Sequence, residues 1–179
     1  MPSPNYADAL HQMRTHDGRL IEAISKKRPV LLVFLRHFGC TFCREALSDL
    51  SRRKHEIDKL GGELVLVHMS TPEIAEKYFA KYDLRGVAHV ADPPCRFYQG
   101  FGLTKGTARQ LFGLHSWIRG FQAGVIDGHG IGKELGDGFQ MPGVFVILNG
   151  MVRNQFVHKL AGERPEYVDL LASCCEVKT

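Results

Sequence analysis

The 179-residue chain has 44% hydrophobic and 23% charged residues, a composition typical of one soluble globular domain, and this excludes a disordered or fibrous protein. Its formal charge of +4 comes from 23 basic and 19 acidic side chains, and the basic residues are spread along the chain, which argues against nucleic-acid binding. No apolar run is long enough to span a bilayer, and the first residues do not resemble a secretion signal. The five cysteines do not form a dense disulfide framework, so we expect a cytoplasmic protein.

The first half of the chain alternates between strand-like and helix-like patterns. An apolar run at residues 30–35 predicts a buried strand, and the apolar side chains that follow at helical spacing predict an amphipathic helix. A second apolar strand is expected at 63–69, with His68 as an interior histidine. The sequence Ser70-Thr71-Pro72-Glu73 then has the capping residue, proline and acidic first turn of a helix.

The second half continues the alternation. Residues 87–91 predict a short third strand, and residues 142–148 predict a fourth. Asn149-Gly150 is the signature of a two-residue hairpin turn before a return strand at 152–157. A final helix is expected from about Pro165. The whole pattern is typical of an α/β domain with a central mixed sheet of four to five strands flanked by helices.

Residues 100–143 differ from the rest because they hold many of the 19 glycines. A helix is expected at 115–123. The Gly128-His129-Gly130-Ile131-Gly132 stretch lacks both the dinucleotide-binding spacing and the P-loop ending, so no nucleotide cofactor is expected. We predict a glycine-rich insertion at 100–143 that covers a functional site or a partner surface, within one domain spanning 1–179.

Two cysteines three residues apart, Cys40 and Cys43, follow the first predicted strand and open the first long helix. Side chains at i and i+3 share one helix face, so the two sulfurs can close a disulfide with little backbone movement. The unpaired N–H groups of the first turn favour a thiolate at the first sulfur. Arg36 and Arg44 flank the pair together with His37, and their positive charges should stabilise the ionised form further. The pattern predicts a redox site.

A CxxC pair can also be half of a zinc site or two core thiols. The sequence contains neither a second CxxC nor an HxxxH pair, so a complete metal site is not predicted, although zinc shared between two chains stays open. Cys95 and Cys174 are expected to be structural thiols, and Cys174-Cys175 is a poor redox pair because adjacent cysteines bridge only with strain. Three further histidines are expected at the surface: His115, His129 and His158.

The order of elements resembles the thioredoxin fold. Three segments are more specifically similar to the peroxiredoxin-like branch of the AhpC/TSA group: residues 34–45, the Ala91-Asp92-Pro93 to Leu103 region, and Pro142-Gly143-Val144-Phe145. The resemblance spans residues 18–170 and implies a thioredoxin-like fold. It also implies that Pro142 is a cis-proline facing the dithiol, and that the substrate groove is lined by Met141, Pro142, Thr41 and Phe42.

The dithiol and this resemblance predict a thiol–disulfide oxidoreductase or thiol-dependent peroxidase that cycles Cys40 and Cys43 between dithiol and disulfide. No flavin or nicotinamide motif is visible in the sequence, so no such cofactor is expected. In the thioredoxin register Cys40 attacks and Cys43 resolves. Peroxiredoxins carry Pro-x-x-x-Thr/Ser-x-x-Cys, and in that register Cys43 attacks, with Arg36 in place of the proline and Cys40 in place of the hydroxyl residue.

The resemblance implies a peroxide or protein-disulfide substrate and a thioredoxin- or glutathione-type reductant, and it is compatible with a homodimer. No nucleic acid or membrane partner is expected. The alternative hypothesis is a non-enzymatic redox-sensing or protein-binding module. It is motivated by the 100–143 region with its single tryptophan, Trp117.

Overall fold

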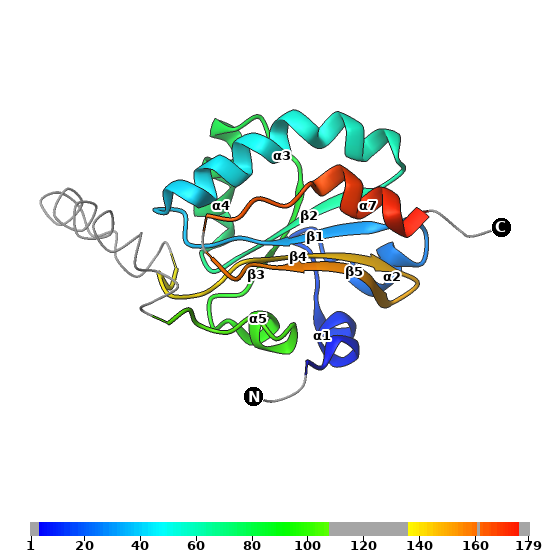
Figure 1. Cartoon of the computed structure of the whole chain (residues 1–179), viewed down its shortest axis with the longest axis horizontal. Helices are drawn as coiled ribbons and strands as arrows, with labels where there is room; N and C mark the ends of the chain where they lie inside the picture. Colours follow the sequence, from blue (N-terminus) through cyan, green and yellow to red (C-terminus); the bar gives the residue numbers. More distant parts are fainter. Residues whose placement is uncertain (1–3, 108–135, 161, 176–179) are drawn as a thin grey trace, which may run out of the picture.

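The computed structural model describes residues 4–107, 136–160 and 162–175 (Figure 1). The helix expected at 115–123 lies outside this part of the chain. Within these ranges, no helix is both long and apolar enough to cross a membrane. The elements in chain order are α1 (Tyr6–Gln12), α2 (Ile21–Ser25), β1 (Val30–Phe34), α3 (Thr41–Lys59), β2 (Glu63–His68), α4 (Pro72–Lys81), β3 (Ala88–Ala91), α5 (Arg96–Gly100), β4 (Gly143–Leu148), β5 (Met151–Val157) and α7 (Tyr167–Cys175).

The five strands form one mixed sheet in the order β3-β2-β1-β4-β5. Strand β2 runs parallel to both β1 and β3, whereas β4 runs antiparallel to β1 and β5. The central strand β1 is buried at all five positions, as its uninterrupted apolar sequence predicts. Asn149 and Gly150 join β4 to β5 with φ of 54° and 71°, the left-handed values that a type I′ hairpin turn requires. The expected α/β class and mixed five-stranded sheet are confirmed.

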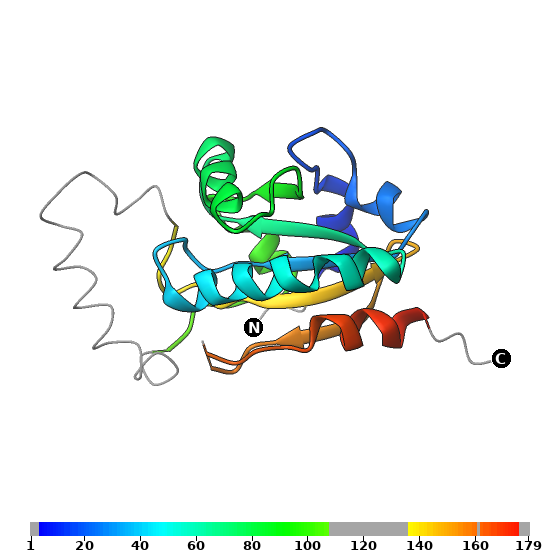
Figure 2. The ribbon, with the colours of Figure 1, turned by 90° about the horizontal axis from the view of Figure 1, so that it is seen from above.

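Helices cover both faces of the sheet, so the protein has two apolar layers. Figures 1 and 2 show α3 and α7 on one face, and Figure 1 shows α1 and α5 on the other. Alternating side chains of β1 supply both layers: Leu31 and Val33 pack with α3, α4 and α7, while Leu32 and Phe34 pack with α1, α2 and α5. The central strand is therefore held from both sides.

The end of β1 is held rigidly before the chain enters α3. The hydroxyl of buried Tyr98 lies 2.6 Å from the carbonyl oxygen of Leu35 and 3.1 Å from that of Val67, so one phenol links the ends of β1 and β2. Phe38 is also buried, with its ring stacked on Tyr78 at a centroid distance of 4.6 Å. These contacts fix the short connection that leads from the central strand to the two cysteines.

Candidate active site

Cys40 lies at the N-cap of α3, and Cys43 lies one turn further into the helix. Both are free thiols, and both are largely buried, with 6% of Cys40 and 2% of Cys43 exposed. The expectation that backbone N–H groups of α3 hold the first sulfur is not met, because the Cys40 side chain makes no capping hydrogen bond. Its hydrogen-bond donor is a side chain instead.

That donor is Arg36, whose Nη1 lies 3.1 Å from the Sγ of Cys40. Arg36 is only 2% exposed, and no carboxylate in the described part of the chain lies within ion-pair distance of it. A buried guanidinium needs compensation, because removing a charge from water is costly unless it is paired. The sulfur of Cys40 accepts a hydrogen bond from this buried cation, and in general such a charge-assisted bond stabilises a thiolate.

The rest of the Arg36 guanidinium is held by the end of the glycine-rich region. Nε donates to the carbonyl of Gln140 at 3.3 Å, and Nη2 donates to the carbonyl of Gly138. Gln140 is itself 2% exposed and donates from its amide to the carbonyl of Leu103 at 2.9 Å. Residues 136–140 thus lie against the site, and they orient the arginine through backbone oxygens rather than through a competing negative charge.

Cys43 has a different environment from Cys40. Burial raises the pKa of the Cys43 thiol far above its ordinary value, and the nearby Cys40 sulfur raises it further, while Arg36 and Arg44 act in the opposite direction with smaller effects. Arg44 is exposed, so its charge is screened by solvent. Cys43 therefore keeps its proton at neutral pH.

A cavity of about 30 Å³ lies beside Cys43, and Arg36, Phe42 and Pro142 contribute to its lining. It has room for a water molecule. Of the residues expected in a substrate groove, Phe42 and Pro142 face this cavity, Thr41 is exposed beside the dithiol, and Met141 is buried.

The expected cis-proline at Pro142 is wrong, because no peptide bond in the described residues is cis. The trans form is the lower-energy state of an X–Pro bond. Two hydrogen bonds fix the backbone of Met141, the residue before the proline. The Met141 amide donates to the carbonyl of Thr104 at 3.2 Å, and the Met141 carbonyl accepts from the side-chain amide of Gln140.

His158 also lines the cavity and is half-buried, so it is less exposed than the expected surface position. Its Nδ1 is buried and has no hydrogen-bond partner in the described structure. Burial lowers the pKa of His158, while the charge of Glu163 and backbone hydrogen bonds to Pro142 and Glu163 oppose this shift, so the ring is neutral at neutral pH. The alternation of side chains along β5 could have predicted this position. Phe156 packs against the core, and His158, two residues later, lies on the same side, with the two ring centroids 4.9 Å apart.

His37 is a second neutral histidine at the site. Burial lowers its pKa to about 4, with Arg36 as the next contribution, and Asp137 opposes both. His37 therefore adds no positive charge near the sulfurs at neutral pH, although the sequence suggested that it would. The flanking charge comes from the arginines.

The sequence profile of the AhpC/TSA antioxidant enzyme family matches residues 49–161, which is more than half of the chain. The chain belongs to this family. The matched segment begins after the dithiol, so family membership rests on the rest of the domain. The chain is also 27% identical over 182 residues to the thioredoxin-like protein AAED1, chloroplastic, of Arabidopsis thaliana, covering 94% of this chain and 73% of the relative.

Solved structures described as peroxiredoxins and as a thiol:disulfide interchange protein have a similar fold. The chain matches Xanthomonas campestris peroxiredoxin Q with a TM-score of 0.65 and 15% identity, covering 97% of this chain and 95% of that one. It matches Mycobacterium tuberculosis peroxidoxin BcpB with a TM-score of 0.63 and 13% identity, covering 93% and 92%. A Chlorobium tepidum protein described as a putative thiol:disulfide interchange protein DsbE gives a TM-score of 0.55 at 19% identity, covering 91% and 88%.

Proposed function

We propose that this protein is a thiol-dependent peroxide reductase in which Cys40 attacks and Cys43 resolves. The observation that carries the proposal is the 3.1 Å contact between Arg36 Nη1 and Cys40 Sγ, because it gives one of the two sulfurs a buried positive partner. Membership of an antioxidant enzyme family supports a thiol-dependent redox activity in general. The low exposure of Cys40 favours a small oxidant, since a peroxide reaches a nearly covered sulfur more easily than a protein disulfide does.

The proposed reaction balances in three steps. The Cys40 thiolate attacks one peroxide oxygen, the O–O bond breaks, and the leaving oxygen takes a proton to become water or an alcohol, which leaves Cys40 as a sulfenic acid. Cys43 then attacks the Cys40 sulfur, an S–S bond replaces the S–O bond, and water leaves. Two external thiol groups, from one thioredoxin-type dithiol or from two glutathione molecules, finally reduce the disulfide by exchange and are themselves oxidised to a disulfide.

The second step requires Cys43 to lose its proton. His158 is suited to accept it through a water in the shared cavity, because its Nδ1 is buried, unbonded within the described residues, and belongs to a neutral ring. The proton then passes to the departing hydroxide. In this scheme His158 is a positioning and proton-accepting residue for the second step and has no part in the first.

Reduction of a protein disulfide is a second candidate function. The observation that favours it is the placement of the CxxC pair across the first turn of α3, where a mixed disulfide at Cys40 can be resolved by Cys43 without helix distortion. A non-enzymatic binding module remains the third hypothesis. We retain the cytoplasm as the proposed location, because a reducing compartment supplies the dithiol that the cycle consumes.

Parallel assays of peroxide consumption and insulin-disulfide reduction test these functions in the wild type, Cys40→Ser and Cys43→Ser proteins, with Cys174→Ser as the control. We expect Cys40→Ser to abolish turnover. Cys43→Ser should complete one oxidation and then form a mixed disulfide through Cys40. A first oxidation that survives in Cys40→Ser and disappears in Cys43→Ser would assign the attack to Cys43 instead. Binding of a partner by a protein that lacks both thiols would favour the non-enzymatic module.

A further inference from the structure

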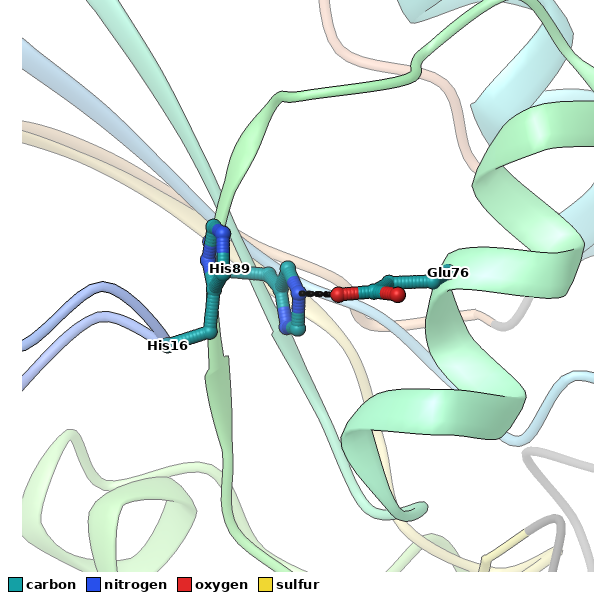
Figure 3. A group of neighbouring side chains, drawn as sticks. All are labelled: His16, Glu76 and His89. Carbon is teal, nitrogen blue, oxygen red and sulfur yellow. Dashed lines mark hydrogen bonds and ion pairs between the residues drawn. The ribbon is translucent and has the colours of Figure 1, made fainter.

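Three side chains that commonly bind metals meet where α4, β3 and the loop before α2 come together. His89 comes from β3, Glu76 from α4, and His16 from the loop, as Figure 3 shows. One donor atom of each lies within 4.8 Å of the other two. None of the three lines the cavity beside Cys43, so the group is separate from the proposed redox site.

The central donor of this group is a buried nitrogen with no hydrogen bond. The side chain of His89 is 2% exposed, and its Nε2 has no hydrogen-bond partner in the described residues. It faces the Glu76 carboxylate across 3.9 Å, which is too long for a hydrogen bond (Figure 3). Two bonds from one zinc ion, each about 2.0–2.2 Å, would reach across this gap. The separation between the buried nitrogen and the carboxylate oxygen therefore matches the span of two metal–ligand bonds.

The other nitrogen of His89 is held in the way that metal ligands usually are. Nδ1 lies 2.9 Å from Nε2 of the fully buried His68, and ligating histidines commonly engage a hydrogen-bond partner through the nitrogen that does not bind the metal. Burial lowers the pKa of His89 to about 4 and that of His68 to about 3. Both rings are neutral at neutral pH, which is the form that binds metals.

We propose that His89, Glu76 and His16 bind one divalent transition-metal cation of the zinc class, with water completing the coordination and His68 orienting His89. Two histidines and a carboxylate are a set that zinc accepts in sites with an open position. The donors differ in mobility: His89 is fixed by burial, whereas His16 and Glu76 are exposed and can close onto the ion. The site would tie together a loop, a strand and a helix.

Metal binding requires two adjustments. The rings of His16 and His89 are stacked, with centroids 4.1 Å apart and planes 7° from parallel, and an imidazole binds an ion in its own plane. His16 must therefore turn, which gives up the long 3.3 Å hydrogen bond from the His89 amide to its Nδ1. His89 must also carry its proton on its own Nδ1 and donate it in a hydrogen bond to Nε2 of His68. The proton of His68 then lies on the Nδ1 of His68, which gives up the 3.3 Å hydrogen bond that this atom accepts from the Ser70 backbone amide. No proton is released in this exchange.

Cobalt titration of the full chain tests the proposal. The dithiol is itself a candidate metal ligand, so the titration uses the Cys40→Ser/Cys43→Ser double variant with the remaining thiols alkylated. We expect one Co²⁺ per chain, with visible d–d absorption and no sulfur-to-metal charge-transfer band. Zn²⁺ should displace the cobalt.

Single substitutions then identify the ligands. In the double variant, Glu76→Gln and His16→Asn should each weaken Co²⁺ binding by about tenfold or more, since even outer-shell partners of metal sites are worth about 10–100-fold. Both residues are exposed, so their loss leaves the fold intact. The exposed Glu166→Gln and His55→Asn variants serve as matched controls and should bind as before.

Three results would overturn the proposal: no saturable binding, binding that Glu76→Gln and His16→Asn leave unchanged, or binding that vanishes when the two cysteines are replaced. These outcomes are independent of the proposed redox function. Glu76→Gln in an otherwise wild-type chain should retain the full peroxidase rate, so failure of the metal site and failure of the peroxide chemistry are distinguishable.

Discussion

Replacing Arg36 should slow the reaction of Cys40 more than any change outside the dithiol itself. Arg36→Met removes the 3.1 Å hydrogen bond to Cys40 Sγ while keeping much of the apolar stem. A hydrogen bond to a charged group contributes about 1.5–3 kcal/mol. Because about 1.4 kcal/mol corresponds to a tenfold change, losing this bond should slow the alkylation of Cys40 by up to roughly 10- to 150-fold.

The assay is the second-order rate of Cys40 alkylation by iodoacetamide, followed by mass spectrometry between pH 5 and pH 9 on the reduced protein. Arg36→Lys keeps the charge but loses the planar fork that also bonds the carbonyls of Gly138 and Gln140, so an intermediate rate is expected. Arg44→Met is the matched control. Its side chain is exposed, so screening by water should limit its effect to a few-fold.

Folding must be checked separately, because Arg36→Met removes the donor from the buried carbonyl of Gln140 and from the part-buried carbonyl of Gly138. Unfolding in urea measures that cost, and the alkylation comparison is valid at denaturant concentrations where both proteins are native. The reasoning is refuted if Cys40 in folded Arg36→Met reacts at the wild-type rate across the pH range. It is equally refuted if Cys43 is the first sulfur to be alkylated in the wild type.

Two further predictions concern the histidines. His158→Gln should leave the first oxidation of Cys40 unchanged but slow disulfide formation by about 10²-fold or more, which is the usual contribution of a general base. The Cys40 sulfenic acid should therefore accumulate, and dimedone trapping measures it. Disulfide formation at the wild-type rate would contradict this role of His158. Burial holds the pKa of His68 at about 3 and that of His89 at about 4. Between pH 6.5 and about 4 the unfolded chain therefore binds protons that the native protein excludes. Stability should fall on acidification, by at most about 1.4 kcal/mol per pH unit for each ring. Urea unfolding across this range measures the slope, which His89→Asn should reduce; a slope that is the same in both proteins would argue against buried neutral rings.

The sequence predicted the fold well because the patterns that set it are local. The unbroken apolar run of β1, the capping residues before α4 and the Asn149-Gly150 turn each specify their element within a few residues. The position of the dithiol at the start of α3 also follows from local order, since a strand and a helix flank it. These features depend on backbone geometry and burial, which short stretches of sequence encode.

The arrangement within the site depends on contacts that are distant in the chain. The carbonyl groups that orient Arg36 come from Gly138 and Gln140, more than a hundred residues away, and any residue type supplies a carbonyl. The sequence could not predict whether the Met141–Pro142 bond is cis or trans, because the two isomers of an X–Pro bond are close in energy and tertiary contacts select one. His158 could have been placed by extending the alternation of β5 by one more residue.

The different environments of the two sulfurs impose an order on the proposed reaction. While Cys40 is a thiolate, its charge is the second-largest reason that the pKa of Cys43 is raised, after burial. Once Cys40 is oxidised to a neutral sulfenic acid or mixed disulfide, that repulsion disappears, while the charges of Arg36 and Arg44 continue to favour the Cys43 thiolate. Cys43 thus becomes easier to ionise only after Cys40 has reacted. The dithiol resists premature attack by Cys43, and the resolving step follows because oxidation of the first sulfur removes the charge that opposed it.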